Sequence, residues 1–408
     1  MVDNKRLAIF GGKAVRQKPF PQRFLFNHKE KKIVNKLLDH SIRTGKQIRY
    51  SGEYQKKYQN KFNKFMGSIG YSHCVNSGTN ALLCCLGALG LKKNSEVIVP
   101  SLTDVGCITP VILMGLKPIP ADIDVFSFNI NIEQIKKKIT AKTKAVIVAH
   151  IGGEVANIIE IKKFLQKKNI YLIEDCSQSH GSEINNIKVG NFGAISFFST
   201  MSSKLHCTGG TGGVVYSRNR KLIKLSQMFA DRGKLLDKNG NFSGKYTNFG
   251  INCTLDEISA AIGCVQIDKL KKNIKKTNVM GETIKRKLQD INSPSKIKNQ
   301  IENTFNVYWF LRIDLDIKKI SVSKKKYCEA LAKEGVNLSE KYRYNPFEHQ
   351  WFKKYLKESR LKYKIPTFIN YENSLKNQYI IFIRENYTKK DISDIFNSIK
   401  KVDSFYKI

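Results

Sequence analysis

The chain has 408 residues, 41% of them hydrophobic, which is enough for two or three domains with a substantial buried core. Its 71 lysines and arginines outnumber 34 acidic residues, and the formal charge of +37 favours anionic partners such as phosphorylated small molecules or nucleic acid. The lysines occur within amphipathic helical patterns along the whole chain and form no single tail, so we expect an anionic small substrate rather than nucleic acid.

The sequence shows no pattern typical of a targeting signal, a membrane span or a metal site. Only a short apolar patch precedes Gly11, and the longest apolar run, residues 81–91, falls well short of the roughly 20 residues that a membrane span needs. The nine cysteines are odd in number and include no Cys-x-x-Cys pair, which favours reduced thiols. We therefore expect a cytoplasmic protein without membrane association and without a metal site.

The first 50 residues are rich in lysine and arginine and are expected to form an arm and a helix. From residue 67 to about 217, short β-branched runs alternate with helical stretches, which is typical of a mostly parallel sheet covered on both faces. We expect strands at residues 96–99, 117–121, 144–150, 170–175, 194–199 and 213–217, and helices at 80–91, 158–168 and 218–231.

The pattern changes after about residue 254. A long helix is expected over residues 255–287, followed by a polar joint, strands at 308–315 and 379–384, and a helix at 323–334. The predicted fold class is α/β, with a mostly parallel, doubly wound sheet and a smaller C-terminal α+β domain. We expect three parts: the arm and helix (1–50), a large domain (51–264) and a small domain (265–408).

Polar residues follow several apolar strands, and ligands of open α/β sheets bind at such strand ends. The first of these places is residues 76–80, a small turn with Gly78 and Thr79 that opens an apolar helix. Backbone N–H groups at a helix start, with a hydroxyl beside them, suit a phosphate. An ordinary Ser/Thr helix cap explains the same residues.

The second place is the end of the apolar run 170–173, where Glu174 and Asp175 follow. A carboxylate at a strand end is suited to hold a proton on a pyridine nitrogen, which makes that ring an electron sink. A structural acid that caps the next turn is the alternative.

The third place is a hydroxyl-rich loop that contains Lys204 and is followed by glycines within residues 209–213. Those glycines allow the backbone to turn back close to a ligand. A lysine amine forms a Schiff base with an aldehyde and can then move protons. Most lysines in such a basic chain are solvated surface groups, and only the context distinguishes Lys204.

The fourth place is Asn252, just before a helix that carries Ala260, Ala261 and Gly263. Small residues permit close helix packing. Their spacing fits a subunit contact and packing within the chain equally well.

Together these four places resemble the DegT/StrS-type sugar aminotransferases, a branch of the fold-type I pyridoxal-phosphate (PLP) enzymes. The resemblance runs from about residue 7 to at least Val265, and its motifs have the family's order and spacing, including the interval from Asp175 to Lys204. It implies a fold-type I PLP transferase with PLP as cofactor and with two catalytic residues. Lys204 would carry the cofactor and move the substrate proton, and Asp175 would pair with the pyridinium nitrogen.

The resemblance also implies the remaining cofactor-binding residues. Gln178 would lie near the ring oxygen, and Gly78, Thr79 and Ser199 would bind the phosphate. Asn252 would reach that phosphate from the neighbouring subunit, which requires a homodimer with shared active sites.

Asp104 occupies the position in the cofactor site where the family usually has an aromatic residue stacked on the pyridine ring. Because a carboxylate supplies no apolar face, we expect Val105, Cys107 or His180 to cover the ring, or the loop to be shifted. The arginine that often follows the family's asparagine by two positions is also missing after Asn252, and the residues before Lys204 depart from the common pattern.

The activity implied by the resemblance is transfer of an amino group from an amino acid, most often glutamate, to a keto group of a nucleotide-linked sugar. One alternative is a PLP-dependent sugar dehydratase, since related members replace the lysine with histidine. Lys204 favours transamination, although His206 lies two residues away. Another alternative is a non-catalytic regulatory relative that binds nucleic acid. Four C-terminal residues could line the acceptor pocket or form a surface turn: Tyr342, Arg343, Tyr344 and His349.

Overall fold

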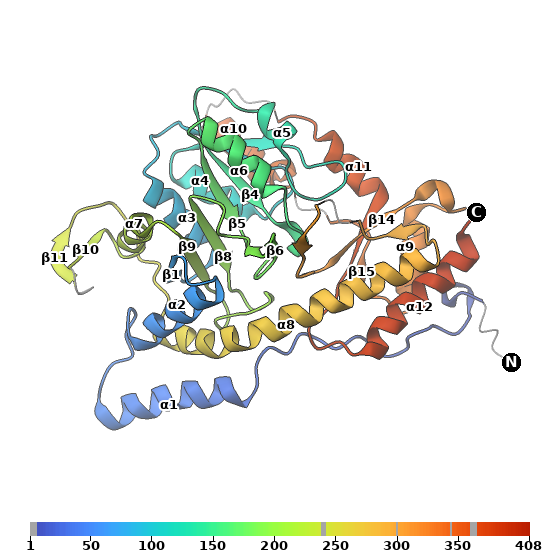
Figure 1. The fold of residues 1–408 in the computed structure, drawn as a ribbon, viewed down its shortest axis with the longest axis horizontal. Helices are drawn as coiled ribbons and strands as arrows, with labels where there is room; N and C mark the ends of the chain where they lie inside the picture. Colours follow the sequence, from blue (N-terminus) through green and yellow to red (C-terminus); the bar gives the residue numbers. More distant parts are fainter. Residues whose placement is uncertain (1–5, 238–241, 299–300, 343–344, 360–364) are drawn as a thin grey trace.

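A seven-stranded sheet forms the centre of the computed structural model, which describes residues 6–237, 242–298, 301–342, 345–359 and 365–408 (Figure 1). The strand order is β1-β9-β8-β5-β4-β2-β3. The strands are β1 (Tyr71–Val75), β2 (Glu96–Pro100), β3 (Lys117–Ala121), β4 (Thr143–Ala149), β5 (Tyr171–Asp175), β8 (Ile195–Ser199) and β9 (Gly213–Ser217).

Most of this sheet is parallel. The neighbouring pairs from β3 to β8 are parallel, whereas β9 is antiparallel to both β8 and β1. The pairing of β4 with β5 places Ala149 opposite Asp175, and the pairing of β5 with β8 places Asp175 opposite Phe197. The carboxyl ends of β5 and β8 therefore lie side by side, and the residues that follow them meet at one edge.

Both faces of the sheet are buried, which explains its nearly continuous apolar strands. In β2, Val97 and Val99 belong to one hydrophobic core, and Ile98 between them belongs to the other. The first core contains α3 (Gly78–Leu89), α4 (Thr109–Leu113) and α7 (Arg220–Ala230). The second contains α2 (Glu53–Phe65), α5 (Ile132–Lys136), α6 (Ile158–Lys167) and the first half of α8 (Glu257–Asp290). The predicted doubly wound α/β core is confirmed.

A four-stranded antiparallel sheet with its own hydrophobic core lies in the C-terminal part. Its strands are β12 (Ser295–Lys296), β14 (Leu311–Leu315), β16 (Gln378–Ile381) and β15 (Leu338–Ser339). Helices α9 (Lys324–Lys333) and α12 (Lys389–Tyr406) pack on it, and α10 (Gln350–Glu358) and α11 (Ile369–Asn377) complete this part. Helix α8 runs along the molecule from α2 to this sheet and connects the two parts (Figure 1).

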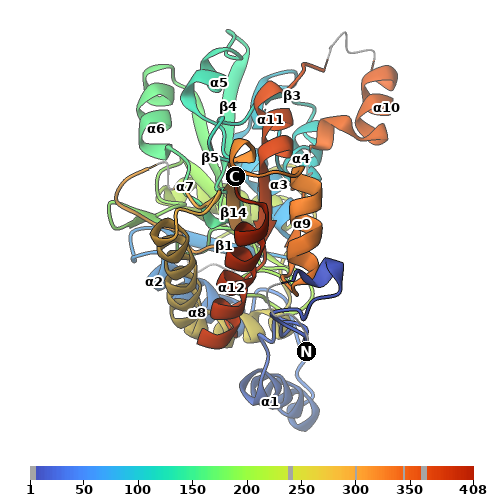
Figure 2. The same cartoon turned by 90° about the vertical axis from the view of Figure 1, so that its right-hand side faces the viewer.

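Several elements lie at the periphery. Helix α1 (His28–Thr44) stands below the large sheet and packs against α8 (Figures 1 and 2). A hairpin of β10 (Lys234–Leu236) and β11 (Phe242–Tyr246) projects from the end opposite to the C-terminus (Figure 1). A small sheet joins β6 (Glu183–Ile184), β7 (Ile187–Lys188) and β13 (Thr304–Phe305). Across the described ranges, no helix has both the length and the apolar character to cross a membrane.

The segment before β14 differs from its prediction. A strand was expected from residue 308, but Tyr308 has a φ of 49° and β14 begins only at Leu311. A positive φ breaks the extended geometry of a strand. The chain therefore turns sharply at Tyr308, and this turn sets the direction of Trp309.

Candidate active site

Lys204 lies in a loop that leaves the end of β8 and folds back on itself. Thr200 N donates to Gly212 O at 2.8 Å, and Lys204 N donates to Met201 O at 2.9 Å. Lys204 is only 9% exposed. Burial lowers the pKa of its amine, and the negative charge of Asp175 partly offsets that effect. Lys204 is therefore not one of the solvated surface lysines.

Asp175 ends β5 and is held by two donors. Ser177 N donates to its Oδ1 at 2.9 Å, and the Cys107 thiol donates to its Oδ2 at 2.9 Å. Burial and the charge of Asp175 raise the pKa of Cys107 well above its ordinary value, so this side chain stays a thiol and a donor. The structure brings Asp175 and Lys204 to the same sheet edge, close enough for the carboxylate to affect the amine.

The start of α3 forms a tight cradle with the end of β8. Ser77 Oγ accepts from Asn80 N at 3.0 Å, which confirms a helix cap, and the first intrahelical bond runs from Ala81 N to Ser77 O. The N–H groups of Gly78 and Thr79 precede that bond and therefore have no acceptor within the helix. A Cβ at Gly78 would lie 2.7 Å from the Cβ of Ser199, so only glycine lets these two segments meet. Gly78, Thr79 and Ser199 are thus brought together.

Asp104 caps a short 3-10 helix, η2 (Val105–Cys107), with its Oδ1 accepting from Gly106 N at 2.8 Å. A Cβ on Gly106 would lie 2.7 Å from Thr79 Oγ1, so this turn lies beside the cradle. Val105 is exposed, and Cys107 is buried against Asp175. His180 is fully buried in a cluster of aromatic rings with Phe198 and His206.

Gln178 follows Asp175 and links the two parts of the molecule. Its Oε1 accepts from Gly152 N at 2.7 Å, and its Nε2 donates to the Tyr342 hydroxyl at 3.0 Å. Tyr342 is buried against the rings of Phe128 and Phe310, so the surface-turn interpretation does not apply to it.

His349 is not brought to this place. His349 is exposed at the start of α10. Arg343 and Tyr344 lie outside the described residues.

Asn252 is exposed, and its Oδ1 accepts from Thr254 Oγ1 at 3.5 Å. Asn76 N donates to Cys253 O at 2.9 Å, which places this segment beside the start of α3. The small residues of α8 pack within the chain: Ala260 and Ala261 are fully buried, and a Cβ added at Gly263 would contact the Tyr58 ring at 2.9 Å.

Two residues at Lys204 were missed by the sequence analysis. The Lys204 Nζ lies over the Trp309 ring, 4.4 Å from its centroid, and Trp309 Nε1 donates to Ser203 O at 3.1 Å. Arg23 Nη1 donates to the same carbonyl. Both residues are more than 100 positions from Lys204, and only the aromatic character of Trp309 offered a signal.

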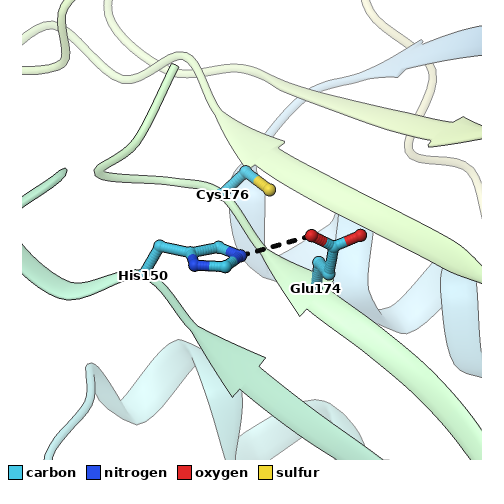
Figure 3. A group of neighbouring side chains, drawn as sticks. All are labelled: His150, Glu174 and Cys176. Atoms are coloured by element: carbon cyan, nitrogen blue, oxygen red, sulfur yellow. Dashed lines mark hydrogen bonds and ion pairs between the residues drawn. The ribbon is translucent and has the colours of Figure 1, made fainter. Parts of the chain in front are cut away.

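His150, Glu174 and Cys176 form the one group of metal-ligating side chains found among the described residues (Figure 3). Glu174 Oε1 accepts from the N–H groups of Phe192 and Gly193, and its Oε2 lies 3.2 Å from His150 Nε2. His150 Nδ1 accepts from a backbone N–H, so its proton is assigned to Nε2, which then donates to Glu174. Glu174 and His150 are thus occupied by partners within the protein, and we interpret the group as a structural anchor.

These groups fit PLP. The cofactor needs a lysine amine for its aldehyde, an acid for its pyridine nitrogen and N–H donors for its phosphate. Lys204 has such an amine, Asp175 such an acid, and the cradle of Gly78 and Ser199 lies at the same edge of the sheet, so these residues would hold the cofactor.

Comparisons with known proteins agree with this geometry. A sequence model of the DegT/DnrJ/EryC1/StrS aminotransferase family matches residues 28–400. GDP-perosamine synthase of Vibrio cholerae is 31% identical over 290 residues, which cover 70% of this chain and 75% of the relative. GDP-4-keto-6-deoxy-D-mannose 3-dehydratase of Escherichia coli O55:H7 is 31% identical over 264 residues, or 60% of this chain and 66% of the relative.

Solved structures show the same fold. The aminotransferase from Psychrobacter cryohalolentis superposes with a TM-score of 0.83 at 22% identity, covering 95% of this chain and 98% of that one. Helicobacter pylori PseC, described as an aminotransferase of pseudoaminic acid biosynthesis, gives a TM-score of 0.81 at 22% identity, covering 95% of this chain and 100% of that one. The chain therefore belongs to the DegT/DnrJ/EryC1/StrS aminotransferase family, which confirms the predicted family, PLP as cofactor and the aminotransferase class.

Proposed function

We propose that this aminotransferase moves an amino group from an amino acid, with glutamate as the expected donor, to a keto group of a nucleotide-linked sugar. The observation that carries the proposal is the buried Lys204 beside Asp175 and the cradle at Gly78. The name of the Vibrio cholerae relative supports a nucleotide-linked aminosugar. The net charge of +37 favours attraction of a diphosphate group.

We propose the following division of work among the residues. PLP, when bound, supplies an aldehyde for the amine and a ring that withdraws electrons. Lys204 holds the cofactor and moves the proton, and burial suits this role because it lowers the pKa of the amine and so makes the neutral base more accessible. Asp175 keeps a proton on the pyridine nitrogen.

The cofactor's other contacts follow from the same edge of the sheet. Gly78, Thr79 and Ser199 bind the phosphate, and Gln178 lies near the ring oxygen. Asp104 belongs to the turn beside the cradle, and with Asp104 capping η2 the turn presents Cys107 toward Asp175.

We further propose a cytoplasmic homodimer in which Asn252 reaches the neighbour's phosphate. The exposure of Asn252 supports this, since its side chain is accessible to a second chain. We also propose the domain division at residues 1–50, 51–264 and 265–408. The separate hydrophobic core of the C-terminal sheet supports it, with α8 shared between the two larger domains.

A PLP-dependent sugar dehydratase is the second candidate, because one relative at 31% identity is named as a dehydratase. His206 does not favour it: its Nε2 lies 2.6 Å from the Tyr58 hydroxyl in the core, and burial lowers its pKa to about 3. His206 is therefore not placed to take the role that histidine has in the dehydratases.

The test is to mix the purified protein with PLP and follow the absorbance band of the lysine-bound cofactor. We expect the band in the wild type and its loss in Lys204→Ala, with Lys269→Ala as a control lysine outside the site. Incubation with glutamate and a keto nucleotide sugar should then give an aminosugar by mass spectrometry. A deoxysugar without new nitrogen would favour the dehydratase, and absence of the band in the wild type would refute both.

The same samples address the non-catalytic alternative. Salt-dependent DNA binding that Lys204→Ala leaves unchanged, together with no cofactor band, would favour a nucleic-acid-binding relative.

A further inference from the structure

Trp309 contacts both the amine of Lys204 and the backbone just before it. The Lys204 Nζ lies 4.4 Å from the centroid of the indole ring, and the indole Nε1 donates to Ser203 O at 3.1 Å. An ammonium group over an indole face is attracted by the ring's quadrupole. One side chain from the C-terminal part therefore contacts both the Lys204 amine and the carbonyl group that precedes Lys204.

The backbone around Trp309 is firmly determined. Tyr308 has a φ of 49°, a conformation that a bulky residue adopts only when its surroundings enforce it. Its hydroxyl donates to Glu282, and its ring packs directly on Gly281, where an added Cβ would lie only 2.4 Å from the ring. Trp309 N donates to Gly152 O at 2.8 Å. These contacts fix the direction in which the indole leaves the chain.

The Ser203 carbonyl receives a second donor, Arg23, from the N-terminal segment. The Arg23 side chain is only 7% exposed, and its Nε lies 3.0 Å from Glu385 Oε2. The carbonyl group that precedes Lys204 is thus held from two segments that lie outside the large sheet. Such double fixation limits rotation of the peptide that carries the lysine.

We propose that Trp309 is a positioning residue for Lys204, with its N–H fixing the lysine loop and its ring face holding the amine and favouring its charged form. The inference rests on the proposed function, because the orientation of Lys204 matters only if it carries the cofactor.

Other groups also act on this amine. Burial has the largest effect and lowers the pKa of the amine, and Asp175 and Asp104 raise it in part. Arg23 also lowers this pKa, and Cys107 and His180 interact with the amine electrostatically. Like the two acids, the Trp309 ring stabilises the charged form of the amine, but it does so without a negative charge.

The main test uses the cofactor-free protein. Limited acetylation at a series of pH values, with the Lys204 peptide quantified by mass spectrometry, gives the pKa of that amine. Trp309→Leu removes both contacts, and Trp309→Phe keeps a ring face but loses the N–H. Because the chain has only two tryptophans, Trp351→Phe is the matched control.

We expect the Lys204 pKa to fall by roughly half a unit or more in Trp309→Leu, by less in Trp309→Phe, and not at all in Trp351→Phe. If Trp309 acted only through side-chain packing, its replacement would change the melting temperature but not the pKa of Lys204. With PLP bound, Trp309→Phe should lower kcat about tenfold with little change in KM, the effect of one lost hydrogen bond on the lysine loop.

An unchanged Lys204 pKa in folded Trp309→Leu overturns the proposal. If Trp309→Leu does not fold, Trp309→Phe decides: a normal kcat overturns the proposal and a reduced kcat at unchanged KM supports it. Failure of the proposed function is distinguishable, since it appears as a missing cofactor band in the wild type, while the acetylation profile is measured without cofactor.

Discussion

Replacing Glu174 with glutamine tests whether the group in Figure 3 is a structural anchor. Glu174 Oε1 accepts from Phe192 N at 2.8 Å and Gly193 N at 2.6 Å, while Oε2 accepts from Gly190 N at 2.8 Å and faces His150 Nε2. Glutamine has only one oxygen. Whichever way its amide turns, the NH₂ group meets backbone N–H donors in place of an acceptor.

The magnitude follows from the burial of this site. Glu174 is 0% exposed and His150 is 1% exposed, so water does not replace a lost partner. If the glutamine oxygen still accepts from the N–H groups of Phe192 and Gly193, the Gly190 N–H and His150 Nε2 lose their acceptor. An unsatisfied buried donor costs about 1–3 kcal/mol, so Glu174→Gln should lower the free energy of unfolding by about 2–5 kcal/mol.

The assay is urea unfolding followed by circular dichroism, with the free energy of unfolding compared between the variant and the wild type. Glu160→Gln is a suitable control, because Glu160 is exposed and accepts only from Asn157 Nδ2 among the hydrogen bonds described for it. We expect the control to stay within about 0.5 kcal/mol of the wild type. A Glu174→Gln value in that same range would refute the anchor.

Three further predictions concern the cofactor site and acid stability. Gly78→Ala places a Cβ 2.7 Å from that of Ser199, so PLP affinity measured by absorbance titration should fall about tenfold or more; wild-type affinity would contradict the cradle. Asp175→Asn should lower kcat about 100-fold or more in a folded protein, and an unchanged kcat would rule out its proposed role. Burial lowers the pKa of His73 to about 4 and of His206 to about 3, from 6.5. Between pH 6.5 and 4 the unfolded chain therefore binds more protons than the native one, and stability should fall as the pH falls, by about 3 kcal/mol from His73 alone at pH 4. A flat urea midpoint over this range would show that these histidines are accessible to protons.

The strand ends were predictable because their signals are local. Asp175 follows an apolar run, and Lys204 follows another after a short hydroxyl-rich loop. Parallel strands place their carboxyl ends on one edge, so local patterns were enough to bring these two residues together. In the structure Asp175 ends β5, and the loop with Lys204 follows β8, the strand that pairs with β5.

Elements whose burial depends on distant partners were not predictable. The sequence of β1 contains Ser72 and His73, which are 4% exposed, and two buried polar residues obscure an apolar strand pattern. The turn at Tyr308 was interpreted as a strand, because a left-handed φ at tyrosine has no sequence signal. It depends on Glu282 and Gly281 of α8, which are about 25 positions away.

The missing aromatic residue at Asp104 shows how the two kinds of information combine. The sequence has an aspartate at position 104, and the structure shows Asp104 capping η2. It also shows an aromatic ring elsewhere: Trp309 lies over the Lys204 amine from a different part of the chain. A comparison position by position would describe this site as poor in aromatic residues, although Lys204 itself contacts an indole. Because the two positions belong to different segments, an aromatic residue restored at position 104 would not replace the contact that Trp309 makes with Lys204.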